Sequence, residues 1–103
     1  MLDNIIKILD DKKAMEIKTI DIAEKSILAD HFVICTGTSS THIRALADEL
    51  EYKMRHEFGT EPRSIEGRSS GWILLDYNDI VVHIFTKDQR EFYNLEKLWG
   101  SKQ

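Results

Sequence analysis

The stretch that decides the fold is residues 72–86, which read WILLDYNDIVVHIFT. Two runs rich in β-branched and aromatic side chains flank the pair Asn78-Asp79, and these two residue types favour the positive φ angles of tight hairpin turns. The stretch therefore predicts an antiparallel hairpin with strands over 72–77 and 80–86.

The two sides of this hairpin differ in chemistry. With Asn78 and Asp79 in the turn, Trp72 lies opposite Phe85, and alternate residues of each strand point to the same side. One side is aliphatic and suited to a core, and it carries Ile73, Leu75, Tyr77, Ile80, Val82 and Ile84. The other side carries Trp72, Leu74, Asp76, Val81, His83 and Phe85. This mixture is enriched in contact hot spots and uncommon in a dry core.

An alternative interpretation of the mixed side stays open at this point. Trp72 and Phe85 can pack under the first or last helix, with His83 hydrogen-bonded to Asp76 only to satisfy both polar groups.

Periodicity places the remaining elements outward from the hairpin. We expect a helix over 2–9, strands over 15–21 and 31–36, a helix over 41–58, a weak edge strand over 63–66 and a closing helix over 88–99. The short link between the first two strands favours antiparallel pairing. In the closing helix, one side is expected to carry Phe92, Leu95, Leu98 and Trp99. This order predicts a single domain over 1–103 of the α/β (α+β) class, a mixed sheet of about five strands with helices packed on it.

Composition excludes several classes of protein. The chain has 103 residues, 42% hydrophobic and 31% charged, which are values typical of one globular domain. Its apolar runs are too short to cross a bilayer, and Asp3 and Asp10 stand where a secretion signal would be basic, so we expect a cytoplasmic protein without a membrane segment. The net charge of −4 disfavours broad adhesion to nucleic acid and is compatible with a basic protein partner. The single Cys35 lies in an apolar run, where a buried thiol is the ordinary interpretation.

The stretch Gly37-Thr38-Ser39 precedes the expected helix 41–58. Hydroxyl side chains at such a place cap the helix, with Ser39, Ser40 or Thr41 as the N-cap. Free backbone N–H groups at a helix N-terminus also bind phosphate, and both interpretations stay open here.

No catalytic or metal-ligating pattern is found. The histidines lie on separate elements without ligand spacing, namely His31, His42, His56 and His83. A strand, a Gly-Ser turn and a helix also begin the active site of nucleotidyltransferases, but the strand that follows, Ser64 to Glu66, lacks their pair of carboxylates. A triad of Ser39, His83 and Asp76 has no nucleophile-elbow spacing. We therefore predict no catalytic residues, no cofactor and no metal.

Five blocks in order resemble the Iojap family of ribosomal silencing factors, RsfS. They are residues 29–39, 42–48, 71–77, 79–85 and 90–99. The resemblance implies a small α/β domain similar in topology to nucleotidyltransferases but without their catalytic carboxylates. It implies that the protein binds the large ribosomal subunit through ribosomal protein fourteen of that subunit and sterically blocks joining of the small subunit, which represses translation. It also implies a homodimer and a bacterial cytoplasm. A nucleotide-binding or nucleotidyltransferase-like enzyme is the alternative.

The partner-facing block of the family falls on residues 71–77 and the strand after them. The predicted partner-binding residues are therefore Trp72, Leu74, Asp76, Tyr77, His83 and Phe85. Trp72 and Phe85 are expected to be exposed anchors, with Asp76 and Glu66 orienting a basic partner. Minor contacts with ribosomal RNA would fall to arginines that are otherwise solvated, namely Arg44, Arg63 and Arg68.

Overall fold

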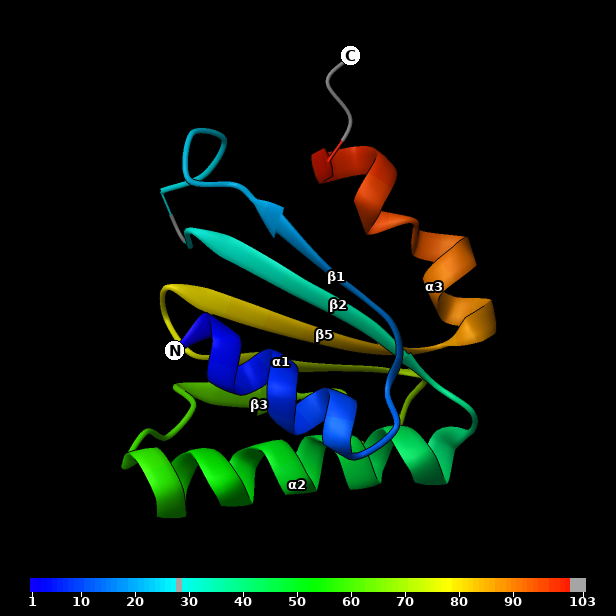
Figure 1. Cartoon of the computed structure of the whole chain (residues 1–103). Helices are drawn as coiled ribbons and strands as arrows, with labels where there is room; N and C mark the ends of the chain where they lie inside the picture. The colour runs from blue at the N-terminus through cyan, green and yellow to red at the C-terminus, as the bar shows by residue number, and fades with distance from the viewer. Residues whose placement is uncertain (28, 101–103) are drawn as a thin grey trace.

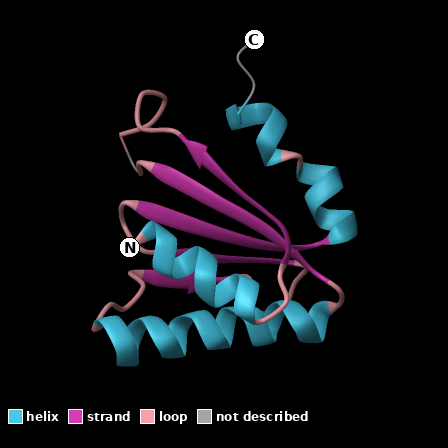
Figure 2. Cartoon of the chain, viewed as in Figure 1, coloured by secondary structure: helices cyan, strands magenta, loops and turns pink. Residues whose placement is uncertain are grey.

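The order of helices and strands agrees with the expected one. The structure is a computed structural model that describes residues 1–27 and 29–100. Its elements are α1 (Leu2–Asp11), β1 (Met15–Asp21), β2 (His31–Gly37), α2 (Ser40–Phe58), β3 (Ser64–Glu66), β4 (Trp72–Asp76), β5 (Ile80–Thr86), α3 (Lys87–Tyr93) and a final π-helical turn, η1 (Glu96–Gly100) (Figure 1, Figure 2). The domain is thus a mixed α+β unit.

The five strands form one sheet in the order β1-β2-β5-β4-β3. The predicted hairpin register is confirmed, because Trp72 pairs with Phe85 in the antiparallel β4–β5 ladder. Asn78 takes the positive φ of 77° that the turn requires. The antiparallel β1–β2 pair and the edge position of β3 are also as expected. The remaining pair, β2 with β5, is parallel and joins the two halves of the sheet.

Helices α1 and α2 cover one face of the sheet, on the opposite side from α3 (Figure 1). This face holds the main core, to which the helices contribute amphipathic stripes and the strands their aliphatic side. Its fully buried members include Ile5, Leu9, Leu46, Leu50, Met54, Val33, Cys35, Ile73, Leu75, Val82 and Ile84. The predicted aliphatic side of the hairpin is therefore core.

The ends of α2 are fixed by local chemistry. Ser39 is the N-cap, since its Oγ accepts the N–H of His42 at 3.1 Å. Gly59 ends the helix with a φ of 63°, in the left-handed region that glycine adopts without steric cost. At the entry to the helix, a Cβ added to Gly37 would lie 2.6 Å from Cγ2 of Ile43, so the turn from β2 into α2 excludes a larger residue.

The expected closing helix over 88–99 is wrong, because Asn94 interrupts it. Asn94 adopts a left-handed conformation, φ 49° and ψ 56°, which ends α3. Asparagine enters this region at little cost because its short polar side chain bonds locally. Phe92 and Leu98 consequently point to solvent with 78% and 71% exposure, whereas Leu95 is buried and Trp99 packs against the sheet.

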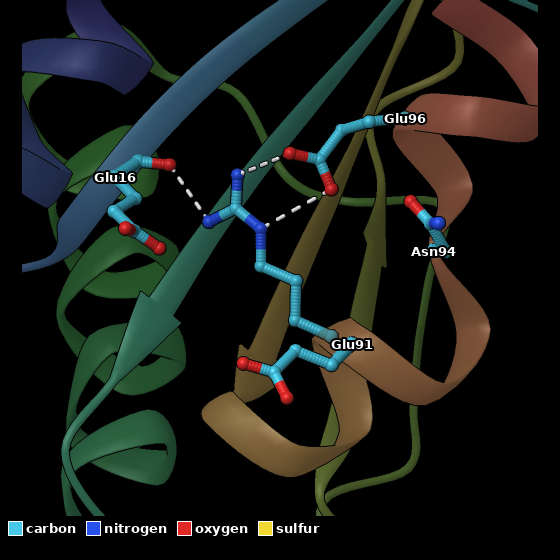
Figure 3. Close-up of a pocket in the computed structure, with 5 residues that line it drawn as sticks. Glu16, Glu91, Asn94 and Glu96 are labelled. Atoms are coloured by element: carbon cyan, nitrogen blue, oxygen red, sulfur yellow. Dashed lines mark hydrogen bonds and ion pairs between the residues drawn. The ribbon is translucent and has the colours of Figure 1, made fainter.

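The break follows from the burial of Arg90, which the sequence pattern did not predict. Its guanidinium forms a two-point ion pair with Glu96, at 2.8 Å from Nη2 to Oε2 and 3.3 Å from Nε to Oε1. Nη1 donates to the Glu16 carbonyl at 2.7 Å (Figure 3). It also donates to Oγ1 of Thr36 at 2.8 Å. Residues six apart lie on different sides of a continuous α-helix, so Glu96 reaches Arg90 only because the chain turns at Asn94.

The Glu16 carbonyl comes to Arg90 from a β-bulge in β1. The pairing register of β1 with β2 shifts between Met15 and Lys18, and Glu16 has a φ of 50°. Bulges bend an edge strand and re-aim its groups. Arg90 therefore ties β1, β2, α3 and η1 together at one buried point.

Glu96→Gln should lower the free energy of unfolding by about 1–3 kcal/mol at pH 7, because it leaves a buried guanidinium without its counter-charge. The hydrogen bond from Arg90 lowers the pKa of Glu96 below 4.5, the ordinary value that it regains in the unfolded chain. The advantage of the wild type is therefore complete above pH 4.5 and shrinks as the pH falls through the lower folded-state pKa.

Urea unfolding of both proteins at pH 7 and near pH 3 measures this difference. Equal stability of wild type and Glu96→Gln at pH 7 would contradict the ion pair.

Candidate functional site

The second face of the sheet is only partly covered. Helix α3 and η1 lie over β1, β2 and the end of β5 (Figure 1). A smaller buried cluster forms there from Ile20, Ile22, Ala29, Ile34, Phe85 and Leu95. Toward β4 and β3 the cover ends. There Leu74 is half-buried and Glu66 is exposed, whereas Ile73 and Leu75, the neighbours on the other face, are fully buried.

We call the half-buried part of this side the open face. The strand register places its members side by side, and they are Phe32, Trp72, Leu74, Asp76 and Val81. Phe32 belongs to it because β2 pairs with β5, so that Phe32 is the partner of Val81. Aromatic, aliphatic and carboxylate groups thus meet on a surface that α3 and η1 cover only in part, with Tyr93 against Trp72 and Trp99 against Phe32.

Trp72 is the most constrained residue of the open face. Its Nε1–H donates to Nδ1 of His83 at 3.1 Å. Its ring lies 5.1 Å from the ring of Phe85 and 4.5 Å from that of Tyr93, measured between centroids. The indole therefore rests on its own domain on one side, and because it is only half-buried the other side is open to a partner.

The alternative interpretation of the mixed side, packing under a helix, is partly right. Trp72 and Phe85 do pack against the last helix, through Tyr93. The bond between His83 and Asp76 is wrong, however, since His83 pairs with the indole.

Three of the predicted partner-binding residues are buried within the domain. Phe85 is 0% exposed, so the expectation that it is an exposed anchor is wrong. The reason is that α3 starts directly after β5 and brings Tyr93 and Leu95 over that end of the strand. His83 and Tyr77 are 3% and 5% exposed, and Tyr77 lies in the aliphatic core, where burial raises the pKa of its phenol.

Asp76 is reachable but already paired. Its Oδ2 accepts Nη2 of Arg63 at 3.0 Å, and its Oδ1 accepts the N–H of Asn78 at 2.8 Å. The carboxylate therefore stabilises the hairpin turn. Its negative charge is partly balanced by Arg63, which the sequence did not indicate. Arg63 is in turn held by Asp76 and Asn78, and Arg68 by Asp48. Of the three arginines considered for RNA contacts, Arg44 is exposed on α2.

His83 is a buried neutral imidazole. Its Nδ1 accepts the indole N–H, which places the ring hydrogen on Nε2. Nε2 is buried without a hydrogen-bond partner. Burial lowers the pKa of His83 from 6.5 to about 4, because the surroundings offer no solvation for a charged ring.

The loop before α2 is a cap. The Thr38 N–H donates to Nδ1 of His42 at 2.8 Å, and Ser39 accepts the His42 N–H. His42 Nε2 lies 3.1 Å from the Lys12 carbonyl oxygen, the acceptor that this tautomer requires. A phosphate at this turn would compete with the imidazole for the Thr38 N–H, so the geometry favours the capping interpretation.

The other residues considered for catalysis or metal binding do not come together in the structure. Ser39 is bonded to His42, His83 to Trp72, and Asp76 to Arg63, so the triad of Ser39, His83 and Asp76 does not exist. Within residues 1–27 and 29–100, no three His, Cys, Asp or Glu side chains are grouped to hold a metal ion. Burial raises the pKa of the Cys35 thiol to about 12, which keeps it protonated and unreactive.

The concavity of about 380 Å³ around Arg90 is a structural site. It is lined by Glu16, Arg90, Glu91, Asn94 and Glu96 (Figure 3). The guanidinium is occupied by the bonds described above, and the remaining charges are carboxylates. The concavity therefore presents no ready cation to an anionic ligand.

A small α+β domain with a half-covered aromatic sheet face fits the class of domains that act by binding another macromolecule. The family model described as "Ribosomal silencing factor during starvation", RsfS, matches residues 1–103. The chain is 43% identical over 101 residues to "Ribosomal silencing factor RsfS" of Halalkalibacterium halodurans, which covers 97% of this chain and 86% of that protein. It is 44% identical over 92 residues to the protein of the same name in Bacillus subtilis, with 88% and 77% covered.

A crystal structure of a protein from Chromobacterium violaceum superposes with a TM-score of 0.88 at 30% identity, covering 100% of this chain and 89% of that one. The chain belongs to the RsfS family of ribosomal silencing factors, and the resemblance stated from the sequence is confirmed. Membership makes it a ribosome-associated regulator of translation and not an enzyme. No helix within the described ranges, 1–27 and 29–100, is long and apolar enough to span a bilayer.

The buried imidazole predicts a specific loss of stability in mild acid. The unfolded chain takes up a proton at His83 below about pH 6.5, whereas the folded protein does so only near pH 4. The wild type should therefore lose up to about 3 kcal/mol of stability between these pH values, and His83→Asn should not show this component.

Urea midpoints of the two proteins at pH 7, 5.5 and 4.5 give the comparison. The same pH slope in wild type and His83→Asn would show that His83 is protonated normally in the folded state.

Proposed function

We propose that the protein binds the large ribosomal subunit through ribosomal protein fourteen of that subunit, using the open face. Occupancy of this site then blocks joining of the small subunit and represses translation. The observation that carries the proposal is the half-buried indole of Trp72, which its own domain holds in place on the sheet face that α3 and η1 cover only in part.

The open face has the properties of a binding hot spot. Tryptophan is among the residues that dominate interface energetics, and it is most effective next to apolar neighbours that exclude water. Leu74 follows Trp72 on the same side of β4, Val81 lies opposite Asp76 on β5, and Phe32 extends the apolar area onto β2. Because the indole is already ordered by a hydrogen bond and two ring contacts, docking costs little side-chain entropy.

The six predicted binding residues divide into two groups. Trp72, Leu74 and Asp76 are reachable and form the contact group, with Trp72 as the anchor. Phe85, His83 and Tyr77 are buried and cannot contact a partner directly. Phe85 and His83 support the indole, and Tyr77 belongs to the core under the same hairpin.

Charge favours a basic protein partner over RNA as the main contact. The chain carries a net charge of −4, and Glu66 is exposed at the sheet edge, opposite Leu74 in the register of β3 with β4. Such a rim charge mainly accelerates association. Contacts with ribosomal RNA are a minor part of the proposal and fall to Arg44, because Arg63 and Arg68 are held in ion pairs.

In this proposal, silencing requires only that the protein occupies its site on the large subunit. We place the protein in the cytoplasm, where ribosomal subunits join. A homodimer remains part of the proposal, and a second copy seated on the open face would compete with the ribosome for the same residues.

Trp72→Ala and Leu74→Asp should each weaken binding to purified large subunits by on the order of 30-fold or more, because one removes the anchor and the other places a charge in the apolar contact. Both should stay folded by circular dichroism, since the two side chains are only half-buried. Tyr52→Ala is the matched control, an aromatic residue of α2 that is 57% exposed.

If Leu74→Asp and Trp72→Ala bind like Tyr52→Ala, the docking surface lies elsewhere. Unfolding of Trp72→Ala would show that the indole serves the core.

Added to purified subunits, the protein should suppress formation of whole ribosomes in proportion to the fraction of large subunits it occupies. The reason is that steric blocking involves no turnover. Sucrose gradients at increasing ratios of protein to large subunit measure the effect, with Leu74→Asp as the inactive control. Unchanged whole-ribosome peaks at saturating wild type would rule out the mechanism.

A further inference from the structure

His83 combines three features that packing alone does not explain. It lies at the middle of the mixed sheet face with 3% exposure, in register with Leu74 of β4 and Ile34 of β2. Its Nδ1 accepts the Trp72 indole N–H at 3.1 Å. Its other nitrogen, Nε2, is buried without a partner.

An unpaired buried N–H is unfavourable for folding, because the group has left water and gained no bond. A leucine or methionine at position 83 would remove this unpaired donor and fill similar space among the neighbouring rings. Those rings are apolar, with Phe32 at 4.5 Å and Phe85 at 6.3 Å from the imidazole between centroids. Fold stability alone therefore gives little reason for a histidine here.

The indole, in contrast, depends on the imidazole for its orientation. The ring contacts of Trp72 with Phe85 and Tyr93 are stacked or tilted, and such contacts persist after a half-turn of the indole about its Cβ–Cγ bond, which keeps the ring plane and exchanges the two edges. The hydrogen bond to His83 selects one rotation, since it fixes which edge of the indole points into the domain. The same bond determines which edge is left for a partner.

We infer that His83 is a positioning residue of the docking surface, which acts through Trp72 and is retained at some cost to the stability of the fold. This inference rests on the proposed function, because it assumes that Trp72 is the anchor. It adds that the buried imidazole presents the indole in its binding orientation.

The test compares His83→Leu and His83→Met, which remove the acceptor, with His83→Asn, whose Oδ1 supplies an acceptor near the position of Nδ1. Trp72→Ala is the reference for loss of the anchor. Each variant is measured for melting temperature, for affinity to purified large subunits, and for the indole N–H resonance of Trp72 by NMR. A Trp99→Phe background leaves Trp72 as the single tryptophan, because the chain has two.

The apolar variants should melt at or above the wild-type temperature at pH 7 yet bind roughly three- to tenfold more weakly, since docking must then order a free indole. Their indole resonance should move upfield, as expected for a lost hydrogen bond. His83→Asn should restore the resonance and most of the affinity. A merely structural role would move melting temperature and affinity together.

The outcomes separate this inference from the proposed function. If Trp72→Ala binds weakly but His83→Leu and His83→Met bind like the wild type, the positioning role is wrong and the docking surface stands. If both apolar variants melt well below the wild type, His83 is a structural residue and the inference fails. If Trp72→Ala itself binds normally, the docking surface is wrong and the role of His83 falls with it.

Discussion

The parallel pairing of β2 with β5 is the interaction on which the rest of the structure depends. It joins an N-terminal hairpin, β1–β2, to a C-terminal meander, β3–β4–β5, so that the two strands at the centre come from distant parts of the chain. It also sets the composition of both faces. On one side it brings Cys35 beside Ile84 in the main core, and on the other it brings Phe32 beside Val81 on the open face.

With the sheet joined in this way, the helices cover it unequally. Two helices bury the aliphatic face, and the short α3 with η1 shields only the β1, β2 and β5 part of the other, with Tyr93 reaching Trp72 of β4. A small domain buries a smaller fraction of its apolar surface than a large one. Contact between water and the exposed apolar surface of the patch is unfavourable, and a partner that covers the patch removes this contact. In the proposed function, binding depends on the same shortage of helix that leaves the patch open.

Local patterns were enough for most of the fold. The hairpin register followed from Asn78-Asp79 and the alternation on either side of it, and the extent of α2 followed from its apolar stripe, its N-cap and Gly59. What local patterns could not show were contacts between distant residues. Nothing near Phe32 indicates that β2 lies against β5, and the pattern around Phe85 left packing under a helix as only one of two open interpretations. The burial of Arg90 was missed for the same reason, because its partners, Glu16 and Thr36, lie more than fifty positions away.

The Arg90 junction has a further consequence for how the domain opens. The main core is held by aliphatic contacts, whereas the C-terminal cover combines apolar contacts of Leu95 and Trp99 with directed bonds around one guanidinium. The two halves of the molecule thus differ in the kind of force that closes them, and proteins open in cooperative units of unequal stability. A change that removes the Arg90 bonds would therefore loosen residues 95–100 over β1 and β2 and leave the helical layer on the other face in place.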